Sequence, residues 1–126
     1  QGHIARAALE AIALQNLDVL DTMEKDSAIK TKELRVDGGA TANDLLLQIQ
    51  ANVANIKIIR PKITETTAQG AAFLAGLATG YWKDIQEIKK IWEPEKIFSP
   101  QSDPNATKMH ENWKKAIDRS KNWLSE

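Results

Sequence analysis

Apolar residues recur at helical spacing near the start of the chain. From Ile4 to about Met23 they return every three or four positions, and neither glycine nor proline interrupts them. This spacing predicts one long helix. Alanines make part of that helix slim, which suits close packing against a sheet: Ala5, Ala7, Ala8, Ala11 and Ala13.

Two short segments have the pattern of strands. Residues 33–36 alternate between polar and apolar and lead into the pair Gly38-Gly39, which is typical of a strand that ends in a tight turn. Residues 56–59 form a short apolar run that Pro61 stops, and this predicts a buried strand.

Helical spacing returns between and after these strands. Residues 42–53 predict a second helix, and residues 68–78, rich in small side chains, predict a third. The threonines at 66–67 are candidate caps for the start of this third helix, and Gly80 is a candidate for its end. The order helix, strand, helix, strand, helix predicts an α/β fold with a parallel pair of strands in its sheet.

The last third of the chain is more polar. Residues 84–90 predict a short helix, residues 97–105 contain two prolines and predict a surface connection, and residues 107–124 predict a final amphipathic helix. We therefore expect residues 84–126 to form a helical C-terminal extension.

Composition and charge exclude several classes of protein. Lys plus Arg and Asp plus Glu are each 17, so no excess charge favours nucleic acid or an acidic membrane as partner. The chain has no cysteine, which fits a reducing, cytoplasmic setting, and its apolar runs are short for a membrane span. It opens with Gln1-Gly2-His3 and helical spacing at once, so we expect its start to be a cut in a longer chain.

The glycine pair is the one place where the sequence suggests ligand chemistry. Without Cβ atoms, the backbone N–H groups at Gly38 and Gly39 can approach a ligand closely, and the helix that follows favours phosphate at its start. Asn43 follows, and its amide can donate and accept. The pattern lacks the Gly-Lys-Ser/Thr of a P-loop and the third glycine of a dinucleotide fingerprint. A tight turn with a helix-start asparagine explains the same residues, so both interpretations stay open.

A family resemblance favours the nucleotide interpretation. Residues 34–43, Leu-Arg-Val-Asp-Gly-Gly-Ala-Thr-Ala-Asn, resemble the adenosine motif of the actin-like ATPase fold, and specifically that of the FGGY family of sugar and polyol kinases. Residues 3–10 and 65–77 resemble two further segments of that family in the same order. The resemblance covers residues 2 to about 92. It implies part of an actin-like, ribonuclease H-like domain with a short mixed sheet flanked by helices.

The resemblance also implies which residues bind ligand. The backbone at Gly39 and the side chain of Asn43 would contact ATP or ADP, while Gly38 and Ala40 would shape the loop. Magnesium would arrive with the nucleotide. The family's catalytic aspartate, acceptor site and β/γ-phosphate loop lie before residue 1, so we expect no catalytic or metal-ligating residue in this chain and no activity from it alone.

Residues 34–40, 75–82 and 113–116 resemble most closely the members that phosphorylate glycerol. The implied partners are ATP and, through the preceding portion, glycerol. Residues 1–126 would then be the C-terminal nucleotide-binding domain, without its first strands. We expect a homo-oligomer, because those missing strands would leave a sheet edge open. Two alternatives remain: a kinase for another sugar or polyol, and a non-enzymatic interaction module built from the helices at 4–23 and 107–124.

Overall fold

A three-stranded mixed sheet organises the protein. The computed structural model describes residues 1–122. Strand β1 (Glu33–Arg35) runs parallel to β2 (Lys57–Pro61), and β3 (Pro94–Phe98) runs antiparallel to β2 on its other side. The predicted α/β class and the parallel pair are confirmed.

Helices precede, connect and follow the strands. Their bounds are α1 (Gly2–Ser27), α2 (Asp44–Ala54), α3 (Thr66–Thr79), α4 (Ile85–Ile91) and α5 (Ala106–Ser120). Each predicted helix is present, with ends that differ by a few residues, and Gly80 ends α3 with φ 76° as predicted. The prediction for α5 reached Leu124, but residues 123–126, including Trp123, lie outside the described residues.

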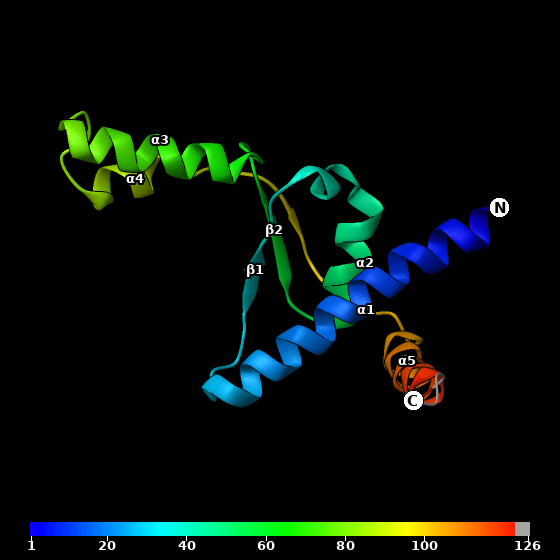
Figure 1. Cartoon of the computed structure of the whole chain (residues 1–126). Helices are drawn as coiled ribbons and strands as arrows, with labels where there is room; N and C mark the ends of the chain where they lie inside the picture. Colours follow the sequence, from blue (N-terminus) through cyan, green and yellow to red (C-terminus); the bar gives the residue numbers. More distant parts are fainter. Residues whose placement is uncertain (123–126) are drawn as a thin grey trace.

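The core lies between α2 and the sheet. Leu47 and Ala51, one helical turn apart, pack on Ile58 of β2 and Phe98 of β3. Burying each large apolar side chain contributes roughly 1.5–3 kcal/mol to folding. Helix α1 packs on the outer side of α2, where its fully buried Ala13 keeps the contact close (Figure 1).

The strand β3 corrects the prediction for residues 84–126. This segment contains two helices, α4 and α5, but it also supplies the strand that pairs with β2. Its sequence, Pro-Glu-Lys-Ile-Phe, lacks the alternation of a half-buried strand, and in the structure only Phe98 is buried. An edge strand that begins with proline escapes prediction for this reason.

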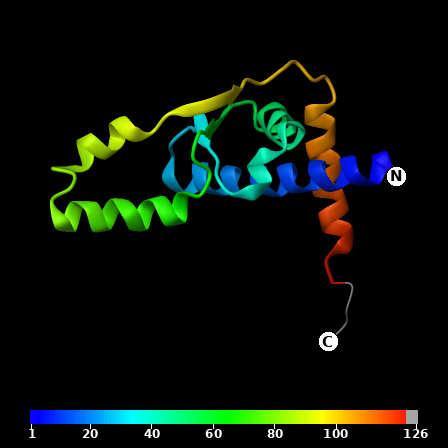
Figure 2. The ribbon, with the colours of Figure 1, turned by 90° about the horizontal axis from the view of Figure 1, so that it is seen from above.

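Helix α5 is anchored on α1 by a polar contact between side chains far apart in sequence. The indole Nε1 of Trp113 donates a hydrogen bond of 2.7 Å to Oδ2 of Asp18. Figure 2 shows α5 crossing α1, and in both views α5 lies on the opposite side of the molecule from α3 (Figures 1 and 2). This contact joins α5 to α1.

Helices α3 and α4 form an arm that extends away from the sheet and the other helices (Figure 2). Helix α3 contains no charged residue, yet only Gly76 is buried within it, and Leu74 is 71% exposed. The ring of Trp82 lies on Gly76 and meets Phe73 edge to face, with ring centroids 5.2 Å apart. This contact folds the turn after α3 back onto the helix.

We predict that Gly76→Ala destabilises the arm by about 1–3 kcal/mol, because the added Cβ would lie 2.2 Å from the ring of Trp82. Tryptophan fluorescence during urea unfolding measures the effect. Gly70→Ala is the matched control, since its Cβ would meet nothing within 4 Å. That variant should gain up to about 1 kcal/mol from helix propensity. Equal free energies of unfolding for the two variants would show that the packing of Trp82 does not require a glycine at position 76.

Candidate functional site

The glycine loop, residues 37–43, connects β1 to α2, and its first half is held by hydrogen bonds. Gly38 adopts φ 84°, a conformation that glycine reaches without strain. Its N–H donates to the carbonyl of Thr64 at 3.0 Å. Its own carbonyl accepts from the backbone N–H of Thr41 at 3.0 Å and from the Thr41 hydroxyl at 2.7 Å.

The next two backbone N–H groups are free. A short 3₁₀ turn, η1 (Gly39–Ala42), follows Gly38, and the first N–H groups of such a turn have no partner inside it. Gly39 and Ala40 are exposed, and within residues 1–122 their N–H groups donate to no other group. A Cβ added at Gly39 would meet nothing within 4 Å. Two adjacent donors are therefore without a partner in the described residues, and the space beside Gly39 is open.

Asn43 is the N-cap of α2. Its Oδ1 accepts a hydrogen bond from the N–H of Leu46 at 3.1 Å, which is the structural role considered from the sequence. The side-chain amide nitrogen makes no hydrogen bond to the part of the chain that the structure describes, and Asn43 is exposed. Its oxygen is thus engaged, and its two amide hydrogens remain available to a ligand.

A buried arginine supports the loop from behind. Arg60 of β2 is only 8% exposed, and its Nη1 donates to the carbonyl of Thr41 at 2.7 Å and to Oδ1 of Asp44 at 2.8 Å. The same guanidinium pairs with Glu95 of β3 through Nε and Nη2. One side chain therefore joins the loop, the first residue of α2 and two strands.

The charges of this network balance one another. Lys96 donates to Oδ2 of Asp44 at 2.6 Å, and together with Arg60 it lowers the pKa of that carboxyl. Glu95 in turn raises the pKa of Arg60 above its ordinary value. Two basic side chains, Arg60 and Lys96, thus lie beside two acidic ones, Asp44 and Glu95.

The sequence patterns did not single out Arg60. A signal was present, since an arginine interrupts the run of apolar residues in β2, and a charge at a buried position needs partners. Those partners come from η1, α2 and β3, and β3 was not predicted.

The glycine loop also contacts the start of α3. The hydroxyl of Thr66 donates to Oδ2 of Asp37, across 29 positions of sequence. The prediction that residues 66–67 cap α3 is wrong, because the N-cap is Glu65 and it makes no side-chain hydrogen bond. The hydroxyl of Thr66 serves the loop instead of its own helix.

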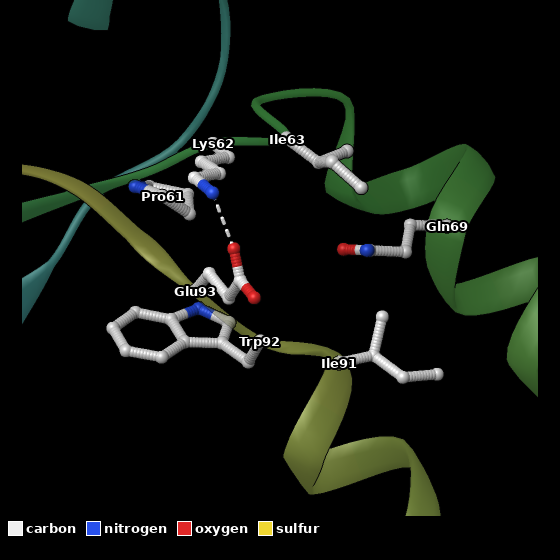
Figure 3. A pocket seen from close by; sticks show the side chains of 7 residues that line it. All are labelled: Pro61, Lys62, Ile63, Gln69, Ile91, Trp92 and Glu93. Carbon is white, nitrogen blue, oxygen red and sulfur yellow. Dashed lines mark hydrogen bonds and ion pairs between the residues drawn. The ribbon is translucent and has the colours of Figure 1, made fainter.

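A separate cavity of about 280 Å³ lies at the root of the arm (Figure 3). It is lined by Pro61, Lys62, Ile63, Gln69, Ile91, Trp92 and Glu93. Lys62 and Glu93 form an ion pair of 2.5 Å across it, which lowers the pKa of Glu93. The cavity shares no residue with the glycine loop, so it does not bring the predicted site residues together. Among residues 1–122 no cluster of three metal-ligating side chains occurs.

The structure is therefore an α/β domain in which α2 covers one face of a mixed sheet and the glycine loop lies between β1 and the start of α2. A family model for the FGGY family of carbohydrate kinases, C-terminal domain, matches residues 1–79. The chain belongs to this family.

Glycerol kinases are among its most similar relatives. That of Deinococcus radiodurans is 53% identical over 124 residues, 98% of this chain and 25% of the relative's length. That of Borreliella afzelii is 55% identical over 126 residues, with the same coverage. The chain thus spans about a quarter of the length of these relatives.

Solved structures agree on the fold. The crystal structure of Plasmodium falciparum glycerol kinase with ADP matches 97% of this chain and 25% of that one, with 34% identity and a TM-score of 0.83. The xylulose kinase of Lactobacillus acidophilus, at 24% identity and a TM-score of 0.80, supports the fold alone. The fold is the actin-like ATPase fold of these kinases, as the sequence predicted. In the described part of the chain, no helix has the length and apolar character needed to cross a membrane.

We predict that Arg60→Met destabilises the protein by about 1–3 kcal/mol in urea unfolding. The variant leaves the buried carbonyl of Thr41 without its donor, whereas Asp44 and Glu95 are about half exposed and can be hydrated. Arg6→Met is the control, since the Arg6 side chain is 56% exposed and pairs with Glu10 on one helix face. It should change stability by less than about 0.5 kcal/mol. Similar losses of unfolding free energy in both variants would show that the network around Arg60 stabilises the protein no more than an exposed ion pair does.

Proposed function

We propose that this chain is the ATP- and ADP-binding portion of a glycerol kinase, which transfers the terminal phosphoryl group of ATP to glycerol. The observation that carries the proposal is the pair of free, exposed N–H groups at Gly39 and Ala40, beside the N-terminus of α2. Adjacent backbone donors at a helix start suit phosphate oxygens. In this role Gly38 shapes the loop and the amide hydrogens of Asn43 donate to the nucleotide.

The similar proteins support this choice of ligand and acceptor. The Plasmodium structure that matches 97% of this chain is described as holding ADP, and the relatives at 53–55% identity are glycerol kinases. Because the chain spans about a quarter of their length, glycerol would bind to a portion outside it. The reaction would take place in the cytoplasm, in keeping with a chain that has no cysteine.

Magnesium would enter this site with the nucleotide. The described residues offer no cluster of three carboxylate or histidine ligands, and the donors at the glycine loop are N–H groups, which bind anions and not cations. This chain's own residues would therefore hold and orient the nucleotide. Phosphoryl transfer depends mainly on positioning and on neutralising charge, and the groups for the second task would lie outside residues 1–126.

A specific observation supports self-association as part of the proposal. Strand β1 pairs with β2 only, so within the described residues its other edge is open, and α3 exposes apolar side chains without a single charge. Open sheet edges and uncovered apolar helices favour pairing with another chain. The same surfaces are what the alternative of a non-enzymatic interaction module would use. A kinase for another sugar or polyol is the alternative within the family.

We predict that Gly39→Val in the complete kinase raises the KM for ATP about tenfold or more, with a smaller change in the KM for glycerol. The added side chain meets no protein atom within 4 Å of its Cβ, and Gly39 has no positive φ, so the fold should tolerate it. It would occupy the space that we assign to the phosphates, and contacts to charged groups are worth roughly 1.5–3 kcal/mol. Steady-state kinetics with each substrate varied in turn measures both constants.

Ala42→Val is the matched control for that variant. Ala42 is exposed and belongs to the same 3₁₀ turn, so it takes the same β-branched side chain beyond the two free donors. Its KM for ATP should stay within about threefold of the wild-type value. Equal effects of Gly39→Val on both substrates would contradict the assignment of the nucleotide to this loop.

The 126-residue chain alone is expected not to phosphorylate glycerol. The family's catalytic base would lie outside the chain, and general-base help alone is typically worth 10²–10⁴-fold in rate. A coupled assay for ADP release with purified chain, ATP and glycerol checks this. Glycerol-dependent turnover at a rate comparable with that of the relatives would refute the division of labour proposed here.

A further inference from the structure

We propose that Asp37 and Thr66 form a positioning pair that sets the glycine loop in its nucleotide-binding conformation. The inference rests on the proposed function, because it assigns a role at the same loop. Asp37 and Ala40 line one cavity of about 150 Å³ next to the glycine loop, so the carboxylate lies close to the free donors. The pair acts on the backbone that presents those donors.

The geometry begins with two contacts between segments that are far apart in sequence. The segment after β2 approaches the loop and accepts the Gly38 N–H at the carbonyl of Thr64, at 3.0 Å. Two residues further on, the Thr66 hydroxyl donates to the carboxylate of Asp37. One backbone and one side-chain hydrogen bond thus hold consecutive residues of the loop against the start of α3.

The hydrogen bonds of Gly38 determine the direction of the N–H of Gly39. In a trans peptide the C=O of one residue and the N–H of the next lie in one plane and point in opposite directions. Thr41 holds the carbonyl of Gly38 on the protein side at 2.7 Å and 3.0 Å, so the N–H of Gly39 points to the open side. This holds only while Gly38 keeps φ 84°, a state that glycine leaves easily. The contacts of Asp37 and of the Gly38 N–H restrict that freedom.

Charge gives the pair a second effect. Asp37 is exposed and lies two positions before the first free donor, so its carboxylate would repel a phosphate if it turned toward the open side. Donation from Thr66 keeps the carboxylate on the side of α3. The hydroxyl serves this purpose although it stands at the first position of a helix whose N-cap, Glu65, provides no side-chain hydrogen bond.

The test compares two substitutions at Thr66 in the complete kinase. Thr66→Val keeps the shape and removes the hydroxyl, whereas Thr66→Ser keeps the hydroxyl and removes a methyl group. We expect Thr66→Val to raise the Kd for ADP, measured by titration calorimetry, and the KM for ATP about threefold to tenfold. The value of kcat and the KM for glycerol should stay within about twofold of wild type. Thr66→Ser should bind ADP like the wild type.

Asp37→Ala is the second variant, and it is expected to raise the Kd for ADP by less than Thr66→Val does, because it removes the hydrogen bond together with the carboxylate that could repel phosphate. The double variant Asp37→Ala with Thr66→Val should be no weaker than the worse single variant, because both changes break one contact. Asp37 is exposed and Thr66 is half-buried, so the melting temperatures of these variants should stay close to that of the wild type. An unchanged melting temperature together with a raised Kd would separate a positioning role from a loss of fold.

If the wild type binds ADP, three results would overturn the inference alone. The first is a Kd for ADP that does not change in Thr66→Val, and the second is a Kd that rises as much in Thr66→Ser as in Thr66→Val. The third is a double variant whose loss of affinity equals the sum of the two single losses. Wild-type protein that binds no ADP would overturn the proposed function, and this inference with it. The two failures are therefore distinguishable by the wild-type titration.

Discussion

The contact on which the glycine loop depends is the buried guanidinium of Arg60. A charge at 8% exposure needs partners on every side, and Arg60 finds them in Thr41, Asp44 and Glu95. These three residues belong to the turn η1, to the first turn of α2 and to β3. The arginine thereby fixes where the loop ends, where α2 begins and how the outer strand lies, through one rigid planar group.

Further hydrogen bonds link Arg60 to the backbone of the glycine loop. Arg60 holds the carbonyl of Thr41, and Thr41 holds the carbonyl of Gly38 through its N–H and its hydroxyl. The peptide plane after Gly38 is then set, and Gly39 and Ala40 are left with free donors at the protein surface. Two nearby acceptors, the Gly38 carbonyl and Oδ1 of Asn43, are engaged by Thr41 and Leu46 instead.

Much of this fold could be predicted from the sequence, because its signals are local. The long helix α1, the parallel pair of β1 and β2, and the glycine pair between strand and helix all follow from periodicity and turn residues. The strand β3 could not be predicted, since four of its five residues are exposed and its pairing with β2 is formed at a distance in sequence. Propensity contains no information about such a partner.

The candidate site, too, could be predicted from the sequence only in part. Gly38, Gly39, Ala40 and Asn43 could be selected from their pattern and from the family resemblance, and they lie together on one loop. Arg60 and Thr66 contact this loop from other elements, across 19 and 29 positions, and no local pattern predicts such contacts. Even the split role of Asn43, with its oxygen bound to Leu46 and its amide hydrogens free, appears only in three dimensions.

The central claim is that the N–H groups of Gly39 and Ala40 bind nucleotide phosphate, and amide NMR on isotope-labelled protein tests it most directly. Titration with ADP should shift the Gly39 and Ala40 amide signals strongly, while titration with adenosine, which lacks phosphate, should shift them little. The amide of Gly38, which already donates to Thr64, should respond less than either. Gly39 and Ala40 signals that ignore ADP, or that respond equally to adenosine, would contradict the claim.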